Sequence, residues 1–418
     1  MNGPHIVVFS REYPPISVGG TSTAARDVAR GLARMGCRVS VVSSGSGTSG
    51  SAGEQDGSAR VYRSGAQRVY DEHTGLRDQS MRTHRGLFAA AEGAVRECGP
   101  PDIVVFPDLF CYPEAAALAR RYDVPLLNIL LQDFRGSTPY DEGAHQVTNG
   151  VTARASDLLA LEEKAIRGSD HTVFISDALR KGIEGHYPDL DRSRSVVHLG
   201  VDFEEIDAVA GSTRPATLRA SLPADAGEKP LVVACGRLVP FKGFSPLLRA
   251  LSETTNPSHL VLVGVGPEAE KLRSLALDLD LRDRVTFAGD ASHLDALAWM
   301  ATADVAVVPS LWESFCYVCA EMMSFAKPVV VSSVDSLNEL IPTDEYGFRV
   351  PVSDSLRHRV IDPEDLREQL DLALSDRQTA MARGEAARKR IQEHFTVELF
   401  AERLSTLVGS LTGEANRV

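Results

Sequence analysis

The stretch P-S-L-W-E-S-F-C-Y-V-C-A-E, Pro309 to Glu321, carries the clearest indications of fold and function in this chain. The apolar run Asp304 to Val308 precedes it and predicts a buried parallel strand. Apolar residues return at helical spacing from Phe315 to Phe325, which predicts a helix. Glu313 should therefore lie in the loop between strand and helix, and Glu321 about two turns into the helix.

Two carboxylates placed in this way suit a ligand with a phosphate between two hydroxyl-bearing rings. Ser314 or Glu313 could cap the helix, and the first backbone N–H groups and the helix dipole would meet the phosphate. Each carboxylate could accept hydrogen bonds from a pair of hydroxyls. A nucleotide-diphosphate sugar has this layout. The alternative is a capped helix with a surface Glu at each position.

The rest of the chain predicts two α/β domains. A length of 418 residues exceeds one ordinary core, and strand-like apolar runs alternate with helical periodicity in each half. The segment from Glu204 to Lys229 is mixed and fits a crossing between domains with a short helix. The expected strands are His5–Phe9, Arg38–Val42, Asp102–Phe106, Pro125–Leu131, His171–Ile175, Val196–Leu199, Leu231–Cys235, Leu260–Val263, Arg284–Ala288, Asp304–Val308, Val329–Ser332 and Gly347–Val350. Three C-terminal helices are expected over Asp362–Leu374, Arg377–His394 and Val397–Leu411.

Composition and charge narrow the class of protein. A hydrophobic content of 43% with 24% charged residues is globular, and a net charge of -13 argues against a nucleic-acid partner. No stretch is apolar for long enough to span a membrane, and the N-terminus leads almost directly into a strand, so we expect a cytoplasmic enzyme. The cysteines are expected to be reduced, and the Cys316–Cys319 pair lacks the further ligands of a zinc site, so no metal is expected.

Two loops in the first half have ligand-binding character. Pro14 and Pro15 prevent helix in the segment Ser10 to Ser22, and Gly19 with Gly20 would allow a ligand to approach the backbone before a helix capped by Thr21 or Ser22. Polar residues are massed from Gln132 to Gly143 at a predicted strand end, where open α/β sheets bind ligands. Each could instead be a plain connecting loop. We expect Ser43 to Ala59 to be a Ser/Gly-rich surface loop and Val151 to Arg167 to be helical.

The second half begins with a similar glycine-containing loop between a strand and a helix. The motif G-R-L-V-P-F-K-G, Gly236 to Gly243, follows a predicted strand and precedes a helix. Arg237 and Lys242 would offer two positive charges, with helix amides, to a diphosphate. The alternative is two surface cations whose stems cover apolar surface. Glycines recur after the next two strands, in G-V-G-P-E at Gly264 to Glu268 and G-D at Gly289.

These motifs resemble those of the retaining GT-B glycosyltransferases of family 4, the glycogen-synthase and mannosyltransferase-like group 1 enzymes. The resemblance rests on Glu313 and Glu321 with seven residues between them, on K-P-V-V-V at Lys327 to Val331, and on G-R-x(4)-K-G, matched position for position. It covers nearly the full length and is most specific in the second half. It implies two Rossmann-like domains facing across a cleft, at 1–203 and 204–394, with a final helix, 395–418, that crosses back to the first.

The resemblance also implies roles for individual residues. The first signature Glu would hold the donor sugar, the second the ribose, and Arg237 with Lys242 the diphosphate. The residues assigned to donor binding are Gly19, Gly20, Gly236, Arg237, Lys242, Gly264, Gly266, Gly289, Glu313, Ser314, Phe315, Cys316, Tyr317 and Glu321. Those assigned to catalysis are Arg237, Lys242, Glu313, Gln132 and Asp133, and those assigned to acceptor binding are Thr21, Asp108, Asp133 and Arg135.

The implied reaction is transfer of a sugar from a nucleotide-diphosphate sugar, with retention and without a metal or cofactor, to a small-molecule acceptor. Acidic residues would suit an amine-bearing acceptor such as an aminocyclitol, and hence natural-product biosynthesis. They are Asp108, Asp133, Asp141 and Glu142. The alternatives are a non-catalytic nucleotide-sugar-binding protein and another enzyme on the same scaffold, such as a sugar-nucleotide epimerase or a phosphorylase.

Three positions depart from the family pattern. Gln132 stands where the family usually has His, Ser314 replaces the usual Gly, and S-F-A-K at Ser324 to Lys327 lacks the usual glycine. In the family this His lies beside the donor sugar, and Gln cannot carry a positive charge near neutral pH. Gln132 therefore predicts a donor whose sugar differs from plain glucose, such as a deoxy, amino or extended sugar.

Overall fold

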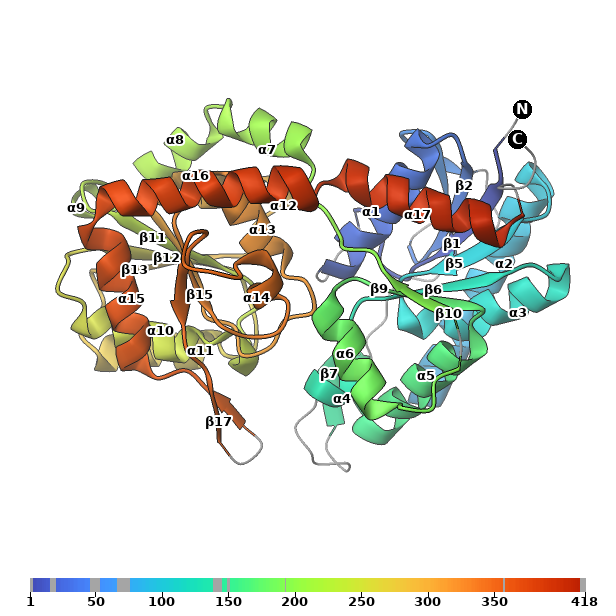
Figure 1. The fold of residues 1–418 in the computed structure, drawn as a ribbon, viewed down its shortest axis with the longest axis horizontal. Helices are drawn as coiled ribbons and strands as arrows, with labels where there is room; N and C mark the ends of the chain where they lie inside the picture. Colours follow the sequence, from blue (N-terminus) through green and yellow to red (C-terminus); the bar gives the residue numbers. More distant parts are fainter. Residues whose placement is uncertain are drawn as a thin grey trace. The chain divides into compact units, whose positions relative to one another are not determined.

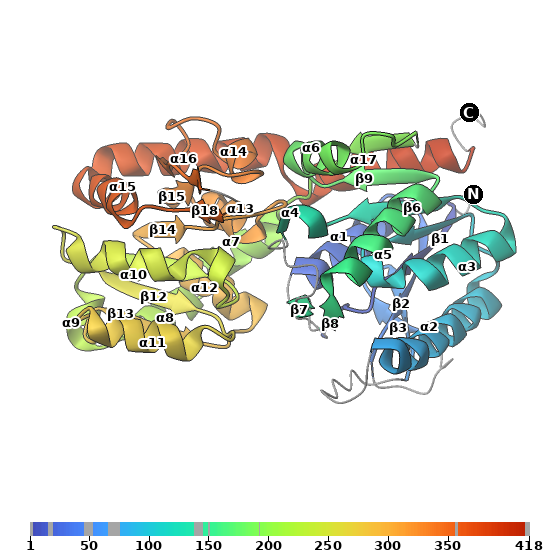
Figure 2. The same ribbon diagram turned by 90° about the horizontal axis from the view of Figure 1, so that it is seen from below.

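The computed structural model describes residues 3–15, 20–45, 53–65, 76–137, 145–148, 151–191, 193–355 and 358–413. It divides into two compact units, Met1–Leu199 with Val397–Val418, and Gly200–Thr396. We call these the first and the second unit. Each contains a largely parallel sheet covered by helices on both faces, the Rossmann-like arrangement predicted from the sequence (Figures 1 and 2). None of the helices in these segments combines the length and apolarity that a membrane span requires.

The first unit is built on an eight-stranded sheet in the order β10-β9-β6-β5-β1-β2-β4-β3. Its strands pair in parallel except β3, which runs antiparallel to β4. The strands are β1 (His5–Phe9), β2 (Arg38–Ser43), β3 (Glu54–Asp56), β4 (Ala59–Arg63), β5 (Ile103–Phe106), β6 (Leu126–Leu130), β9 (His171–Phe174) and β10 (Ser193–Val196). A separate hairpin joins β7 (His145–Thr148) and β8 (Val151–Arg154).

The helices of this unit follow the strands in the usual crossover pattern. They are α1 (Gly20–Arg34), α2 (Leu76–Cys98), η1 (Leu109–Cys111), α3 (Tyr112–Tyr122), α4 (Phe134–Ser137), α5 (Ala155–Gly168), α6 (Asp177–His186) and, from the end of the chain, α17 (Val397–Leu411). Ser176 caps α6 by accepting a hydrogen bond from the Leu179 amide.

The second unit contains a six-stranded parallel sheet in the order β13-β12-β11-β14-β15-β16. The direction in which the chain adds strands reverses between β11 and β14, which makes this the topological switch point of the sheet. The strands are β11 (Leu231–Cys235), β12 (His259–Val263), β13 (Val285–Gly289), β14 (Val305–Val308), β15 (Val329–Ser332) and β16 (Phe348–Val350). A two-stranded hairpin, β17 (Ser353–Ser355) and β18 (His358–Val360), lies outside this sheet.

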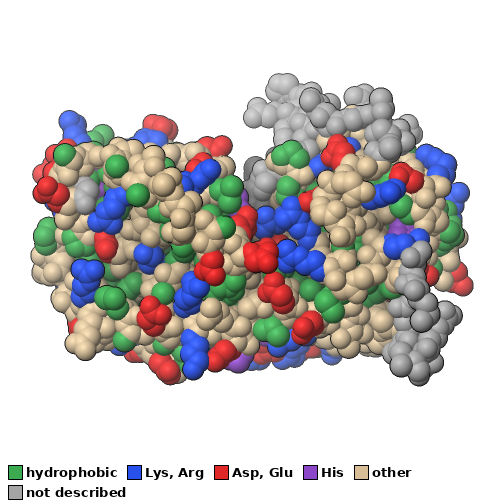
Figure 3. All heavy atoms as spheres, turned by 90° about the horizontal axis from the view of Figure 1, so that it is seen from above, with side chains coloured by type: hydrophobic (Ala, Val, Ile, Leu, Met, Phe, Trp, Pro, Cys, Tyr) green, Lys and Arg blue, Asp and Glu red, His purple; other side chains and the backbone are tan. Residues whose placement is uncertain are grey.

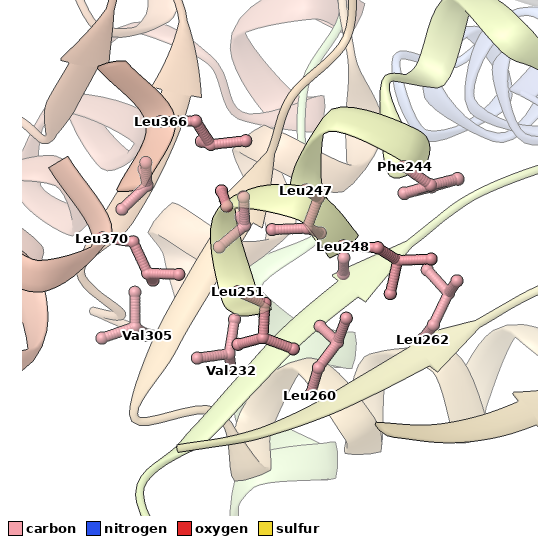
Figure 4. Packing of buried hydrophobic residues seen from close by; sticks show 14 of the residues in the cluster. Val232, Phe244, Leu247, Leu248, Leu251, Leu260, Leu262, Val305, Leu366 and Leu370 are labelled. Atoms are coloured by element: carbon pink, nitrogen blue, oxygen red, sulfur yellow. The ribbon is translucent and has the colours of Figure 1, made fainter. Parts of the chain in front are cut away.

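The helices of the second unit are α7 (Phe203–Ala210), α8 (Arg214–Ala220), α9 (Ala224–Gly227), η2 (Pro240–Lys242), α10 (Phe244–Glu253), α11 (Ala269–Asp278), α12 (His293–Thr302), α13 (Tyr317–Ser324), α14 (Leu337–Leu340), α15 (Pro363–Ser375) and α16 (Arg377–His394). Leu247 and Leu251 of α10 pack with Val232 of β11, Leu260 of β12 and Leu366 of α15 in one buried cluster (Figure 4). Because β11 and β12 are covered in this way, their side chains are buried throughout and their sequences are continuously apolar.

The expected strands of both sheets are present, most within one or two residues of their predicted ends, but several elements differ from the prediction. The segment Ser43 to Ala59 contains β3, and β4 begins at its end; the polar edge strand E-Q-D has no apolar pattern by which to predict it. Val151–Arg154 is a strand, not helix, and the Asn-Gly pair before it was an unused hairpin signal. The last strand of the first unit lies at Ser193–Val196, before its predicted position.

Both signs of charge occur on one face of the protein. Figure 3 shows acidic and basic side chains interspersed over the face in view.

The final helix α17 packs against α1 within the first unit (Figure 1). The contact is close because Gly31 has no side chain: a Cβ added there would lie 2.9 Å from the Cβ of Ala401. Gly409, also in α17, has open space around its missing Cβ. Gly31 is therefore required for close packing of the two helices, whereas position 409 has room for a side chain.

We expect Gly31→Ala to lower the free energy of unfolding by about 1–2 kcal/mol, because the added methyl group overpacks the α1–α17 contact. Gly409→Ala should raise the free energy of unfolding by up to about 1 kcal/mol, because alanine loses less backbone entropy in a helix. Denaturant unfolding of both variants measures the difference. Stabilisation by both substitutions would contradict the packing of α17 on α1.

Candidate active site

The sequence motifs of the second unit converge at the carboxyl edge of its sheet. The loop Gly236–Gly243 follows β11, and the loop Pro309–Cys316 follows β14. These two strands are neighbours at the switch point, which is the place where open α/β sheets bind ligands.

The two loops touch through their backbones. Gly243 has φ +70°, and a Cβ there would lie 1.8 Å from the Pro309 carbonyl oxygen. The Leu311 amide donates to the Phe241 carbonyl at 2.7 Å, and the rings of Phe241 and Trp312 meet edge to face. Only glycine fits at position 243, because any side chain would force the two loops apart.

The glycines after β12 attach a third loop to this pair. A Cβ at Gly264 would lie 2.0 Å from the Gly236 carbonyl oxygen, and one at Gly266 would lie 2.4 Å from that of Leu238. The Leu238 amide donates to the Val265 carbonyl at 2.9 Å, which continues the pairing of the two strands beyond their ends. The G-x-G spacing therefore fixes the backbone around Arg237. Gly289, the last residue of β13, accepts from the Gly264 amide at 2.9 Å.

Lys242 and Glu313, predicted to hold different parts of one ligand, are bonded to each other. Lys242 Nζ lies 2.6 Å from Glu313 Oε1, and both side chains are largely buried. Burial disfavours the charged form of Lys242, but the adjacent Glu313 carboxylate outweighs it, so the pKa of Lys242 is raised above its ordinary value. Arg237 is close enough to act on the same pKa in the opposite direction. Three predicted charged residues thus gather at one point.

The helix after this loop starts later than predicted. α13 begins at Tyr317, and Cys316 before it has φ 72°, an uncommon conformation for a residue with a side chain. The expected capping by Ser314 or Glu313 is wrong: the residue at the cap position is Cys316, whose side chain makes no capping hydrogen bond, and the Glu313 carboxylate pairs with Lys242 instead.

Glu321 lies one turn inside α13 and is buried. Burial and, second to it, the charge of Glu321 raise the pKa of the Cys235 thiol, so this carboxylate lies near the end of β11. Phe315 and Cys316 are buried as well, whereas Ser314 and Tyr317 are half-buried. Glu321 thus lies near the same carboxyl edge of the sheet as Glu313.

The first unit has a pocket of its own at the carboxyl ends of β5 and β6. It brings together three residues predicted from the sequence, Thr21, Asp108 and Gln132. The other lining residues are Pro107, Leu109, Phe110, Asn128, Ile129, Leu130, Leu131 and Phe134. Gly20 is the first residue of α1, so Thr21 and Ser22 lie inside the helix and do not precede it as caps; Gly19 lies outside the described residues.

The polar floor of this pocket was not predicted. Asn128, in the middle of β6, is 1% exposed, and its Nδ2 has no hydrogen-bond partner in the described segments. A buried amide donor is rarely left unpaired in proteins, and a ligand or a water molecule would satisfy it. An Asn inside the apolar run L-L-N-I-L was the sequence signal for this position.

Asp108 is engaged by Arg11, a residue that sequence reasoning missed. Arg11 donates from Nε to Asp108 Oδ2 at 2.8 Å and from a terminal nitrogen to Oδ1 at 3.1 Å, and its guanidinium lies 4.0 Å from the centre of the Phe110 ring. Both side chains are buried. The Asp108 carboxylate also caps η1 through the Phe110 amide. Asp108 therefore holds the pocket wall, and its charge is compensated.

Asp133 and Arg135 belong to a second polar cluster, behind Phe134. Asp133 is buried with Oδ2 3.3 Å from His186 Nε2 of α6, and it is absent from the pocket lining. Arg135 lies over the ring of Tyr187. Asp108 is paired with Arg11, and Asp133 lies beside a histidine that is charged only when protonated, so the acidic acceptor face stays a prediction. Asp141 and Glu142 lie outside the described residues.

Glu162 of α5 is the centre of this second cluster. It accepts from the Phe134 amide at 2.6 Å and from the Tyr187 hydroxyl at 3.0 Å. Complete burial, and then the nearby Asp133 charge, raise the pKa of Glu162 to about 8. The raised pKa favours the protonated form of Glu162 at neutral pH, and the bond from the Phe134 amide holds the backbone near Gln132.

We expect the Glu162 contribution to stability to be fully present below about pH 4.5 and to be lost as the pH rises through about 8, because only the folded state keeps the proton in this range. Glu162→Gln, which mimics the protonated form, should match the wild type near pH 5 and exceed its free energy of unfolding by a few kcal/mol above pH 8. Denaturant unfolding across this pH range measures the difference. Glu163→Gln, on the exposed side of α5, is the control, and a pH-independent difference for Glu162→Gln would contradict the assignment.

Comparison with known proteins agrees with this geometry. Residues 219–390 match the model of glycosyl transferases group 1, and residues 19–200 match the glycosyl transferase 4-like domain. The two matches lie in order along the chain and together cover most of it. The chain belongs to the group 1 glycosyltransferases, and its fold is the GT-B fold.

Individual relatives cover different parts of the chain. The glycogen synthase of Mycobacterium tuberculosis is 27% identical over 405 residues, which is 93% of this chain and 91% of that protein. The alpha-D-kanosaminyltransferase of Streptomyces kanamyceticus is 29% identical over 230 residues, which is 52% of this chain and 58% of the relative.

Solved structures share the fold over nearly the whole length. Sucrose-phosphate synthase from Thermosynechococcus elongatus has a TM-score of 0.79 at 21% identity, covering 98% of this chain and 100% of its own. Anabaena HepE in complex with UDP-glucose has a TM-score of 0.70 at 18% identity, with the same two coverages. At these identities the likeness concerns the fold alone.

Proposed function

We propose that the protein transfers a sugar from a nucleotide-diphosphate sugar to a small-molecule acceptor. One observation carries the proposal: Arg237, Lys242, Glu313 and the first turn of α13 meet at the switch point of the second sheet, with Glu321 one turn further on. The charges and hydrogen-bonding groups are those that a diphosphate between two hydroxyl-bearing rings requires. Structures of HepE, which shares the fold, hold UDP and UDP-glucose, which favours a UDP-sugar here.

Each residue then has a distinct task. Lys242 and Arg237 with the first amides of α13 bind the diphosphate, Glu321 binds the ribose, and Glu313 binds hydroxyls of the sugar. Gly264, Gly266 and Gly289 bring backbone groups to the nucleotide base. Lys242 pairs with Glu313, and a diphosphate bound at Lys242 would compete with that carboxylate, so donor binding exchanges a carboxylate for a phosphate as its partner. This exchange frees Glu313 for the sugar while keeping Lys242 charged.

We propose that transfer retains the anomeric configuration and needs no metal. The acceptor oxygen or nitrogen bonds to the anomeric carbon on the face from which the diphosphate leaves, the bond from that carbon to the phosphate oxygen breaks, and the leaving phosphate takes the acceptor proton. Negative charge grows on the diphosphate during this step. Arg237, Lys242 and the helix amides supply the positive charge that stabilises it.

The acceptor is assigned to the pocket of the first unit. Thr21, Asn128 and Gln132 offer hydrogen bonds beside the rings of Phe110 and Phe134, a combination that suits a small hydroxylated ring. Resemblance to the kanosaminyltransferase supports a role in natural-product biosynthesis. An amine-bearing acceptor such as an aminocyclitol stays part of the proposal, with Asp108 in the pocket lining as the carboxylate nearest to it. Because the Gln132 side chain is neutral, we also propose that the donor sugar differs from plain glucose.

We expect Arg237→Ala and Lys242→Ala each to lose most transfer activity while the fold survives. Each removes a charge-assisted contact to the leaving group, so kcat/KM should fall by about 2–4 kcal/mol in transition-state free energy. A panel of nucleotide sugars tested by thermal shift first identifies the donor, since binding raises stability. Product analysis with that donor then measures transfer.

Lys271→Ala, an exposed lysine in the same unit, is the matched control and should behave as wild type. Wild-type rates in either folded active-site variant would end the diphosphate assignment. Donor binding without transfer or hydrolysis under any condition would instead favour a non-catalytic binding protein. Conversion of the donor without an acceptor would favour an epimerase.

We expect the two signature carboxylates to separate in binding experiments. Glu321→Gln should weaken binding of the free nucleoside diphosphate, because the ribose contact exists without the sugar. Glu313→Gln should leave that binding nearly intact and impair transfer, because its ligand is the sugar. Calorimetric titration of both variants with the nucleoside diphosphate distinguishes them. The reverse pattern would mean that the two roles are exchanged.

A further inference from the structure

The loop that carries Glu313 is held by a residue from outside the main sheet. Arg359 lies in β18, in the hairpin that follows β16. One terminal nitrogen of its guanidinium donates to the Leu311 carbonyl at 3.0 Å and to Asp335 Oδ2 at 2.5 Å. The other terminal nitrogen donates to Asp335 Oδ1 at 2.8 Å. Arg359 thus bonds the loop after β14 and the loop after β15 at once.

Asp335 passes this restraint on to Glu313. Its Oδ2 accepts a long hydrogen bond from the Glu313 amide, at 3.4 Å, and the neighbouring Ser336 hydroxyl donates to the Glu313 carbonyl at 3.1 Å. Both peptide groups of Glu313 are therefore bonded to the loop that Arg359 fastens. Lys242 holds the Glu313 side chain, so the backbone and the carboxylate of this residue are restrained from different directions.

Two features distinguish this contact from an ordinary surface ion pair. The guanidinium binds both carboxylate oxygens and a backbone carbonyl, which adds direction to the charge attraction. Asp335 also has φ 38°, a conformation that costs a residue with a side chain on the order of 1 kcal/mol and persists only where its surroundings impose it. By contrast, Arg367 pairs with Glu364 and Asp371 within its own helix.

We propose that Arg359 and Asp335 are positioning residues that hold Glu313 in place for the sugar of the donor. The inference rests on the proposed function, which makes Lys242 leave Glu313 when the diphosphate binds. From that moment the Glu313 side chain has lost its partner, and the backbone restraint through Arg359 is what keeps the carboxylate directed. Arg359 itself has no assigned contact with the nucleotide.

This role predicts a selective defect. Arg359→Ala should bind UDP as the wild type does, because Arg237, Lys242 and Glu321 remain in place. It should lose the additional affinity that the sugar gives UDP-glucose, and kcat/KM should fall about 10- to 100-fold, as expected when a binding group is displaced by a fraction of an ångström to 1 Å. Arg359→Lys keeps one hydrogen bond and the charge, so it should recover part of the loss.

The experiment is calorimetric titration with UDP and with UDP-glucose, or with the donor that the thermal-shift panel selects and its nucleotide. It compares the wild type, Arg359→Ala, Arg359→Lys and Asp335→Asn, with Arg367→Ala as the matched control. The Arg359→Ala and Asp335→Asn double variant should be no worse than Arg359→Ala alone, because removing Arg359 already breaks its contact with Asp335. A wild-type ratio of the two affinities in Arg359→Ala overturns the proposal. So does an equal fall in both, which would indicate a general structural role or a direct nucleotide contact.

Hydrogen exchange without ligand separates this inference from the proposed function. In Arg359→Ala the amides of residues 311–316 should exchange faster, while those of the sheet exchange as in the wild type. Unchanged exchange in this loop overturns the positioning role whatever the protein binds. If the wild type binds no nucleotide or nucleotide sugar, the proposed function fails, and the part of the inference that concerns the sugar fails with it.

Discussion

The candidate site at the carboxyl edge of the second unit's sheet depends on one backbone contact, the close approach of Gly243 to the Pro309 carbonyl oxygen. No side chain fits between them, so the loops after β11 and β14 lie against each other at the switch point of the sheet. This contact places Lys242 within hydrogen-bonding distance of Glu313 and lets the Leu311 amide reach the Phe241 carbonyl. The charges of the site are thus gathered by backbone geometry, and the ion pair follows from it.

Much of the fold could be predicted because periodicity is a local property. Continuous apolar runs such as L-V-V-A-C at β11 require a strand covered on both faces, and the glycines after β11 and β12 mark backbones that must approach closely. Elements without such a local signature were missed. β3 is polar, and the hairpin β17–β18 is short and lies outside the sheet; only their partners in space define them.

The side-chain pairs of the site could be predicted only in part, because a sequence shows which charges are present but not which ones meet. Glu313 was a candidate helix cap until its carboxylate was found on Lys242. Asp108 is a candidate acceptor ligand, and the sequence did not show that Arg11, from a loop about one hundred residues earlier, pairs with it. Arg359 had no motif at all. A sequence does not show which charged residues pair when they lie at the ends of different strands and far apart along the chain.

The burial of the cysteines near Glu313 and Glu321 lowers the reactivity of their thiols. Cys235, Cys316 and Cys319 are buried, and burial, aided by nearby carboxylates, raises the pKa of each thiol. Thiolate is the form that reacts with peroxides, disulfides and alkylating reagents, and burial disfavours it here. The three thiols beside Glu313 and Glu321 are therefore poor nucleophiles.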